Sequence, residues 1–194
     1  MTRKINNSYL LGQSNAPTAG GDILKIRIDG TPVWEEVDGF EYINKWFGGR
    51  GIFAGVKNAR ETIEYITIST PSNTTDFGDL TDGRFNLSGC SNGSRGVFGG
   101  GSSSSNGIVV TMDYITISTT GDALDFGDLT DVYYGAACTS DTTRAVTGGG
   151  RKAGTQVNNI EYFTMATTGN SSDFGDLTVA RVYFSACSDG TKAV

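Results

Sequence analysis

The sequence predicts an all-β fold built from three consecutive copies of one unit of about 50 residues. The clearest observation is the string Asp-Phe-Gly-Asp-Leu, called here the repeat motif, which begins at Asp76, Asp125 and Asp173. A cysteine follows each copy at a nearly constant distance, at Cys90, Cys138 and Cys187. The chain also has 28 glycines and only 19% charged residues, which favours many short strands and tight turns over helices.

Each unit is expected to contain four strands. A Gly-rich strand comes first, over residues 50–55, 95–101 and 144–150. A strand rich in β-branched and aromatic residues follows, centred on Tyr65, Tyr114 or Tyr162. The repeat motif forms a short third strand after a polar turn. The cysteine then lies on the fourth strand, for example over residues 132–138.

Residues 1–45 stand outside the repeats and form the first of two predicted domains, with the repeats in residues 46–194. Within this head, residues 24–28 alternate apolar and charged side chains, and Asp29-Gly30 is a favoured hairpin turn, so residues 23–28 and 31–37 are predicted to form a β-hairpin. Two interpretations stay open. The head is either a small cap over the first unit or a docking segment whose contacts include Trp34 and Trp46.

The order of features in each unit resembles the kelch repeat. Gly99-Gly100 and Gly148-Gly149 correspond to the kelch diglycine, and Arg84 and Arg181 lie near its arginine position. The motif phenylalanines occupy the usual kelch tryptophan position, at Phe77, Phe126 and Phe174. Unit one has Ala54-Gly55 in place of the diglycine, and the middle unit has Asp131-Val132 in place of the arginine. The resemblance implies that each unit is one four-stranded propeller blade, with the Gly-rich strand innermost.

Three blades are fewer than the 4–8 that propellers typically contain. We therefore expect the ring to be closed in one of two ways. Either a second copy of the chain supplies three more blades, giving a homo-oligomer, or further blades follow in a longer protein. An open arc of blades would expose strand edges, which gives either form of closure a physical reason.

The head and the repeats are together similar to known phage proteins. The head segment GDILKIRIDGTPVWEEV looks like the attachment pieces of phage tail fibres. The repeats resemble kelch-like repeats in virion structural proteins of marine bacteriophages. The resemblance implies a virion component, such as a tail fibre, appendage or surface decoration, made in the host cytoplasm. Its implied partners are other virion proteins and a host-surface glycan or receptor.

Composition excludes several classes of function. The net charge of −6 argues against a nucleic-acid partner. No stretch is apolar enough to predict membrane insertion. Because the chain has no histidine, it lacks the usual general base and metal ligand, and we expect no catalytic residue, no metal site and no cofactor. The cysteines are expected to be buried, reduced and, lying on separate blades, too far apart for a disulfide.

The segments between the Gly-rich and Tyr strands vary most between units, both in length and in sequence. Variable loops on a repeated scaffold are where binding is expected, although neutral drift of exposed loops would give the same pattern. The candidate binding residues are Lys57, Asn58, Arg60, Ser103, Ser104, Asn106, Arg151, Lys152 and Gln156.

The sequence therefore predicts a non-enzymatic structural or binding protein of a phage particle. Two alternatives from other classes stay open. One is a glycan-active propeller enzyme of the sialidase type, which needs a cluster of arginines that the sequence does not display. The other is a cellular kelch-type scaffold for protein partners.

Overall fold

The computed structural model describes residues 22–26, 32–36, 49–56, 60–103 and 105–194. Within these ranges every regular element is a β-strand, which confirms the all-β prediction. The chain divides into two compact units, Met1–Lys45 and Trp46–Val194. In the first, β1 (Asp22–Ile26) and β2 (Pro32–Glu36) pair antiparallel, as the hairpin prediction required. Trp34 is a position in β2, whereas the Asp29-Gly30 turn and Trp46 lie outside the described residues.

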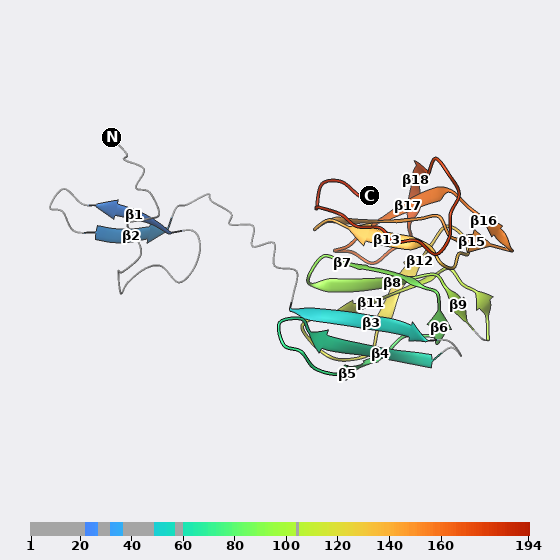
Figure 1. Cartoon of the computed structure of the whole chain (residues 1–194), viewed down its shortest axis with the longest axis horizontal. Coiled ribbons are helices and arrows are strands. Elements are labelled where there is room, and N and C mark those ends of the chain that lie inside the picture. Colours follow the sequence, from blue (N-terminus) through green and yellow to red (C-terminus); the bar gives the residue numbers. More distant parts are fainter. Residues whose placement is uncertain (1–21, 27–31, 37–48, 57–59, 104) are drawn as a thin grey trace. The chain divides into compact units, whose positions relative to one another are not determined.

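The second unit contains three larger antiparallel sheets that follow one another in chain order, together with two small sheets described below (Figure 1). Sheet 1 has the order β3 (Arg50–Val56), β4 (Arg60–Thr67), β5 (Thr75–Asp79). Sheet 2 has the order β7 (Ser88–Ser91), β8 (Arg95–Gly99), β11 (Thr111–Thr116), β12 (Leu124–Asp128). Sheet 3 has the order β13 (Ala137–Ser140), β14 (Arg144–Gly148), β17 (Asn159–Thr164), β18 (Ser172–Asp176).

The predicted Gly-rich, Tyr and repeat-motif strands are all present, but the cysteine strand belongs to a different sheet than expected. β7 carries Cys90 and pairs with the Gly-rich strand of the following unit, β8, and β13 pairs with β14 in the same way. The cysteine strand is therefore the first strand of sheets 2 and 3. β7 and β13 also lie beside each other, with the Ser140 hydroxyl donating to the Ser91 carbonyl at 2.7 Å. Sheets 2 and 3 therefore meet at this edge through their cysteine strands. The Gly-rich strands, which were expected to be innermost, do not make this contact.

The cysteine strand is also shorter than predicted. β13 begins at Ala137, and of the preceding residues Tyr134 makes only one isolated bridge, to Arg151. The reason is local. The side chain of Tyr133 is buried in the apolar core between sheets 2 and 3, and Gly135 takes a left-handed conformation with φ of 68°. Residues 132–136 therefore form a connection from one sheet to the next instead of a strand.

A side-chain turn joins each cysteine strand to its Gly-rich strand. The Asn92 Oδ1 atom accepts the N–H groups of Ser94 and Arg95, and Asp141 Oδ1 accepts those of Thr143 and Arg144. Such Asx turns favour Asn or Asp at this point in every unit. Asp189 makes the same turn with Thr191 and Lys192.

The apolar core lies in two layers, each between two consecutive sheets. Junction 1, between sheets 1 and 2, buries Ile63, Phe77, Leu80, Phe98, Ile115 and Ala123. Junction 2, between sheets 2 and 3, buries Val97, Met112, Phe126, Leu129, Tyr133, Ala145, Phe163 and Met165. Each sheet therefore buries its apolar side chains against its neighbours in the series, as stacked repeats do.

Candidate binding surface

Two small ribbons occupy the variable segments of the second and third units. The first pairs β9 (Ser102–Ser103) with β10 (Gly107–Ile108), and the second pairs β15 (Arg151–Lys152) with β16 (Thr155–Gln156). Both project from the same side of the sheets (Figure 1). In sheet 1 the corresponding segment is only residues 57–59, between β3 and β4. The longer segments of the second and third units thus contain these ribbons.

The structure brings part of the predicted residue set onto these ribbons. Ser103 is buried, Arg151 is half-buried, and Asn106, Lys152 and Gln156 are exposed. Lys57, Asn58 and Ser104 lie outside the described residues. Arg60 is the first position of β4. The exposed candidates are therefore polar side chains that can offer hydrogen bonds to a ligand.

Ser103 is a correction to the predicted set, because its hydroxyl is directed inward. Its Oγ atom accepts the N–H groups of Ser105 and Asn106, each at 3.3 Å, and so holds the ribbon turn. Ser103 also pairs through its backbone with Arg84 of β6 (Arg84–Phe85). This residue therefore supports the ribbon and does not face a ligand.

A carboxylate stands at the base of each ribbon, six residues after the start of the repeat motif. Asn106 donates to Asp82 at 3.3 Å in the first ribbon. In the second, the ammonium group of Lys152 pairs with Asp131. The hydrogen bond from Lys152 is the main cause that holds the pKa of Asp131 below its usual value. Each ribbon is thus fixed to the sheet by a polar contact, and the sequence pattern did not identify Asp82 or Asp131 in this role.

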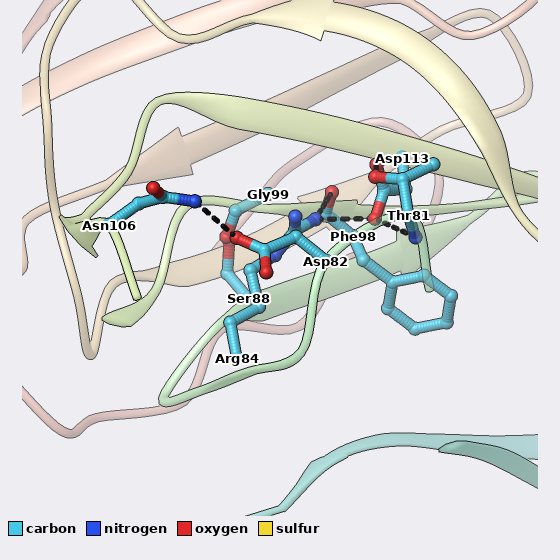
Figure 2. Close-up of polar contacts among 8 residues, drawn as sticks. All are labelled: Thr81, Asp82, Arg84, Ser88, Phe98, Gly99, Asn106 and Asp113. Carbon is cyan, nitrogen blue, oxygen red and sulfur yellow. Dashed lines mark hydrogen bonds and ion pairs between the residues drawn. The ribbon is translucent and has the colours of Figure 1, made fainter. Parts of the chain in front are cut away.

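Directly beneath the first ribbon, a buried polar group connects sheets 1 and 2 (Figure 2). Arg84 and Asp113 are both fully buried, and Arg84 Nη2 lies 2.8 Å from Asp113 Oδ2. Thr81 donates its hydroxyl to Asp113 Oδ1 at 2.5 Å and its N–H to Oδ2 at 3.4 Å. Among the described residues, Nε and Nη1 of Arg84 have no hydrogen-bond partner.

A second set of buried polar side chains joins sheets 2 and 3, with a tyrosine in place of the arginine. Thr130 donates its N–H and its hydroxyl to the carboxylate of Glu161, at 2.9 and 2.5 Å. Tyr133 stands where junction 1 has Arg84, eight residues after the start of the motif, and its Oη accepts from Asn159 at 2.6 Å. Burial, followed by the charge of Glu161, raises the pKa of Tyr133 above its usual 10.0.

A β-bulge places the acid at each of these points. The register between the Tyr strand and the repeat-motif strand shifts immediately before Glu64, Asp113 and Glu161. A bulge turns a side chain away from regular alternation. At Asp113 and Glu161 the carboxylate meets the threonine of the preceding sheet. The sequence analysis did not select these acids, although their constant place twelve residues before each motif is visible in the sequence.

The cysteines correct another prediction. Cys90 and Cys138 are half-buried and Cys187 is exposed, so the three are not uniformly buried. All three are free thiols. The strands of Cys90 and Cys138 are neighbours, and hydrogen bonding with the Cys90 thiol, followed by burial, is the cause that raises the pKa of Cys138 well above its usual value. Both thiols line a cavity of about 350 Å³, together with Ser91, Thr139, Ser140 and Ser188–Gly190.

Two structural features are absent from the described residues. No three His, Cys, Asp or Glu side chains in this part of the chain come together in a way that would hold a metal ion. Nor does it contain a helix of sufficient length and apolar character to cross a membrane. The two fully buried acids of the junctions are engaged by threonine, and the ribbons present neutral and basic polar groups. Comparison of the chain with protein-family models and with curated proteins finds no match.

Proposed function

We propose that residues 46–194 form kelch-like propeller blades of a phage structural protein, and that the two ribbons bind a host-surface glycan or receptor without catalysis. The blade assignment is supported by the sheet order, since sheets 2 and 3 each contain four antiparallel strands arranged side by side in chain order. It is also supported by the contact between β7 and β13, since the first strands of neighbouring blades converge on the axis of a propeller.

One observation carries the binding role. The ribbons β9–β10 and β15–β16 occupy the same place in consecutive units and differ in their exposed residues. The residue that follows each repeat motif, by contrast, is always threonine, at Thr81, Thr130 and Thr178. A fixed scaffold with variable loops on one side is typical of a recognition protein. Exposed Asn, Lys and Gln side chains suit the hydroxyl groups of a glycan.

A binding experiment with surface polysaccharides of marine bacteria tests this role. The triple variant Asn106→Ala, Lys152→Ala, Gln156→Ala is expected to lose at least about tenfold in affinity, because several hydrogen bonds of about 0.5–1.5 kcal/mol each are removed. The matched control changes three exposed threonines on the turns before the repeat-motif strands, Thr70→Ala, Thr119→Ala and Thr168→Ala. Equal affinity of the two triple variants would contradict the ribbon assignment.

The same experiment addresses the absence of catalysis. The polysaccharide is recovered after incubation, and its chain length and sugar composition are compared with those before. The proposal requires both to be unchanged. Shortening of the polysaccharide by the wild-type chain would favour the glycan-active alternative instead.

The particle assignment rests on the resemblance of the head and repeats to phage proteins, and a separate measurement tests it. An antibody against residues 46–194 is expected to label purified particles of the phage that encodes the chain. Deletion of residues 1–45 should leave the sheets folded and remove the label, if the head is the docking segment. Particles that never carry the label would overturn the assignment.

A further inference from the structure

The two outer sheets of the series each leave uncovered a surface that is buried elsewhere in the molecule. Phe77 and Phe126 are 2% and 1% exposed, whereas the equivalent Phe174 of sheet 3 is 54% exposed. On the other side, Ile117 and Met165 are 5% and 0% exposed, whereas the equivalent Ile68 of sheet 1 is 65% exposed. Each outer sheet therefore presents one half of a junction.

The surface on sheet 3, the Thr178 face, carries the donors of a junction. Thr178 stands five residues after the start of its repeat motif, as Thr81 and Thr130 do, and it is exposed. Arg181 occupies the position of Arg84 and is also exposed. In junction 1 these two positions together bind the carboxylate of Asp113.

The surface on sheet 1, the Glu64 face, carries the acceptor. Glu64 follows the bulge of β4 and accepts a hydrogen bond from the Thr74 hydroxyl at 3.1 Å. Glu161 is held in the same way by Ser171, at 2.5 Å. The difference is that Glu161 also receives Thr130 from the preceding sheet, whereas Glu64 is exposed. The acid is thus already oriented for a threonine that would come from another sheet.

The backbones of the two faces match as well. In each junction the N–H group of the motif's second aspartate donates to a side chain of the next sheet: Asp79 to Asp122 and Asp128 to Asn170, both at 3.0 Å. The equivalent pair is Asp176 on the Thr178 face and Asn73 beside the Glu64 face.

Two further features repeat across the junctions. Arg50 and Arg95 donate to the carbonyls of Ile117 and Met165 in the next sheet, at 2.7 and 2.9 Å. The equivalent arginine is the exposed Arg144, and the equivalent carbonyl is that of Ile68. A Cβ atom at Gly78 or Gly127 would lie about 2.5 Å from the backbone of the next sheet, whereas at Gly175 it would meet nothing within 4 Å.

From these correspondences we infer that the Thr178 face of one copy binds the Glu64 face of a second copy of the chain. Thr178 donates its N–H and hydroxyl to Glu64, and Arg181 pairs with the same carboxylate. Phe174 and Ile68 become buried as in the internal junctions. The inference does not depend on the particle assignment, because every contact is copied from a junction within this chain.

One segment has to move when the second copy binds. Cys187 and Val194 exchange two backbone hydrogen bonds of 2.8 Å, so residues 192–194 lie where a Gly-rich strand begins in sheets 2 and 3. In the second copy that strand is β3, and no described residue pairs with its free edge. β3 would replace residues 192–194 beside Cys187, and the hydrogen bonds lost would be restored by those gained.

The proposed contact is head-to-tail, since two different faces meet. Each copy keeps one unused face after the first contact, so assembly ends only when a ring closes. Variants that each disable one face separate this arrangement from any other. Ile68→Asp disables the Glu64 face, and Phe174→Asp disables the Thr178 face. Because both side chains are exposed in the single chain, each variant is expected to keep the circular dichroism spectrum of the wild type and the melting temperature that the wild type has when dilute and dissociated.

The test is the mass of the 194-residue chain in solution, over a range of concentrations. The wild type is expected to assemble beyond its monomer mass of 20.5 kDa. Each single variant is expected to stay monomeric when alone, and a 1:1 mixture of the two is expected to form a dimer and nothing larger. The matched control is Leu124→Asp, which changes a 59% exposed apolar residue of sheet 2 and should assemble like the wild type.

A charge exchange tests the polar contact specifically. Glu64→Arg and Arg181→Glu should each weaken assembly by at least about tenfold, and the double variant should assemble more strongly than Glu64→Arg alone, because the ion pair is restored with its charges reversed although Thr178 still lacks its acceptor. A wild type that stays monomeric at every concentration would overturn the proposal. So would a mixture of Ile68→Asp and Phe174→Asp that forms no dimer, or one single variant that assembles alone.

Discussion

Junctions 1 and 2 have the same architecture and different chemistry. In both, a threonine donates its N–H and hydroxyl to an acid that a bulge brings to the sheet surface. In junction 1 the acid Asp113 is paired with the cation of Arg84. In junction 2 Glu161 is surrounded by the neutral donors of Thr130, Ser171 and Asn159. The threonine and the acid are therefore the constant part of the repeat, and the residue at the Arg84 position sets how the negative charge is compensated.

Because only junction 1 contains a buried cation, neutralising the acid is expected to destabilise junction 1 more than junction 2. This is the largest contrast in stability that we predict. Asp113→Asn leaves the buried Arg84 cation without its counter-ion, and is expected to cost about 3–5 kcal/mol. Glu161→Gln removes a charge that has only neutral partners, and is expected to cost about 1–2 kcal/mol. Urea unfolding of the two variants measures both values. Equal losses would show that Arg84 and Asp113 do not behave as a buried ion pair.

The same comparison extends from the internal junctions to the Thr178 face. Gly127 and Gly175 have nearly the same φ, 138° and 139°, so alanine at either position introduces similar backbone strain. Only at Gly127 does the new Cβ meet the backbone of the next sheet. Gly127→Ala is therefore expected to destabilise the fold by about 1–3 kcal/mol more than Gly175→Ala does, because overpacking adds to the strain. If thermal unfolding finds the two variants alike, sheets 2 and 3 are not in close contact at this point.

A smaller effect concerns Tyr133, whose pKa is raised in the folded protein. Its proton is lost from the unfolded chain near pH 10, so the stabilisation is complete below that pH and falls as the pH rises further, by up to about 1.4 kcal/mol per pH unit. Tyr133→Phe is expected to cost about 1 kcal/mol at neutral pH by losing the bond from Asn159. Its unfolding free energy should also fall less steeply above pH 10. A slope identical to that of the wild type would contradict the assigned environment of Tyr133.

Much of the fold could be predicted from the sequence because strands leave a local pattern. The repeat motif, the Tyr segments and the Gly-rich segments each appear as strands near their expected bounds. The Asp29-Gly30 turn correctly predicted the pairing of β1 with β2. In each case the information lies within a few neighbouring residues.

The assignment of the cysteine strand to a sheet could not be predicted in this way. In a continuous repeat, each strand has one neighbour before it and one after it, and the sequence alone does not say where one sheet ends. Cys90 therefore seemed to close the first unit, whereas β7 opens sheet 2. For the same reason Cys90 and Cys138 were expected to lie far apart, whereas their strands are neighbours.

The candidate site was predicted only in part, for a similar reason. Ribbon residues such as Asn106 and Lys152 stand out because their segments vary. Asp113 and Glu161 differ in side-chain length, and Arg84 and Tyr133 differ in chemistry, so neither position looks invariant. Their importance follows from contacts across about 30 residues of sequence, such as the 29 that separate Arg84 from Asp113.

Amide hydrogen exchange at three threonines tests the central claim most directly, namely that one threonine–acid contact joins successive sheets. The N–H groups of Thr81 and Thr130 are bonded within the chain, so both should exchange slowly at every protein concentration. The N–H group of Thr178 should exchange rapidly in dilute solution and slowly once copies associate. Exchange at Thr81 and Thr130 as fast as at Thr178 in dilute solution would contradict the account.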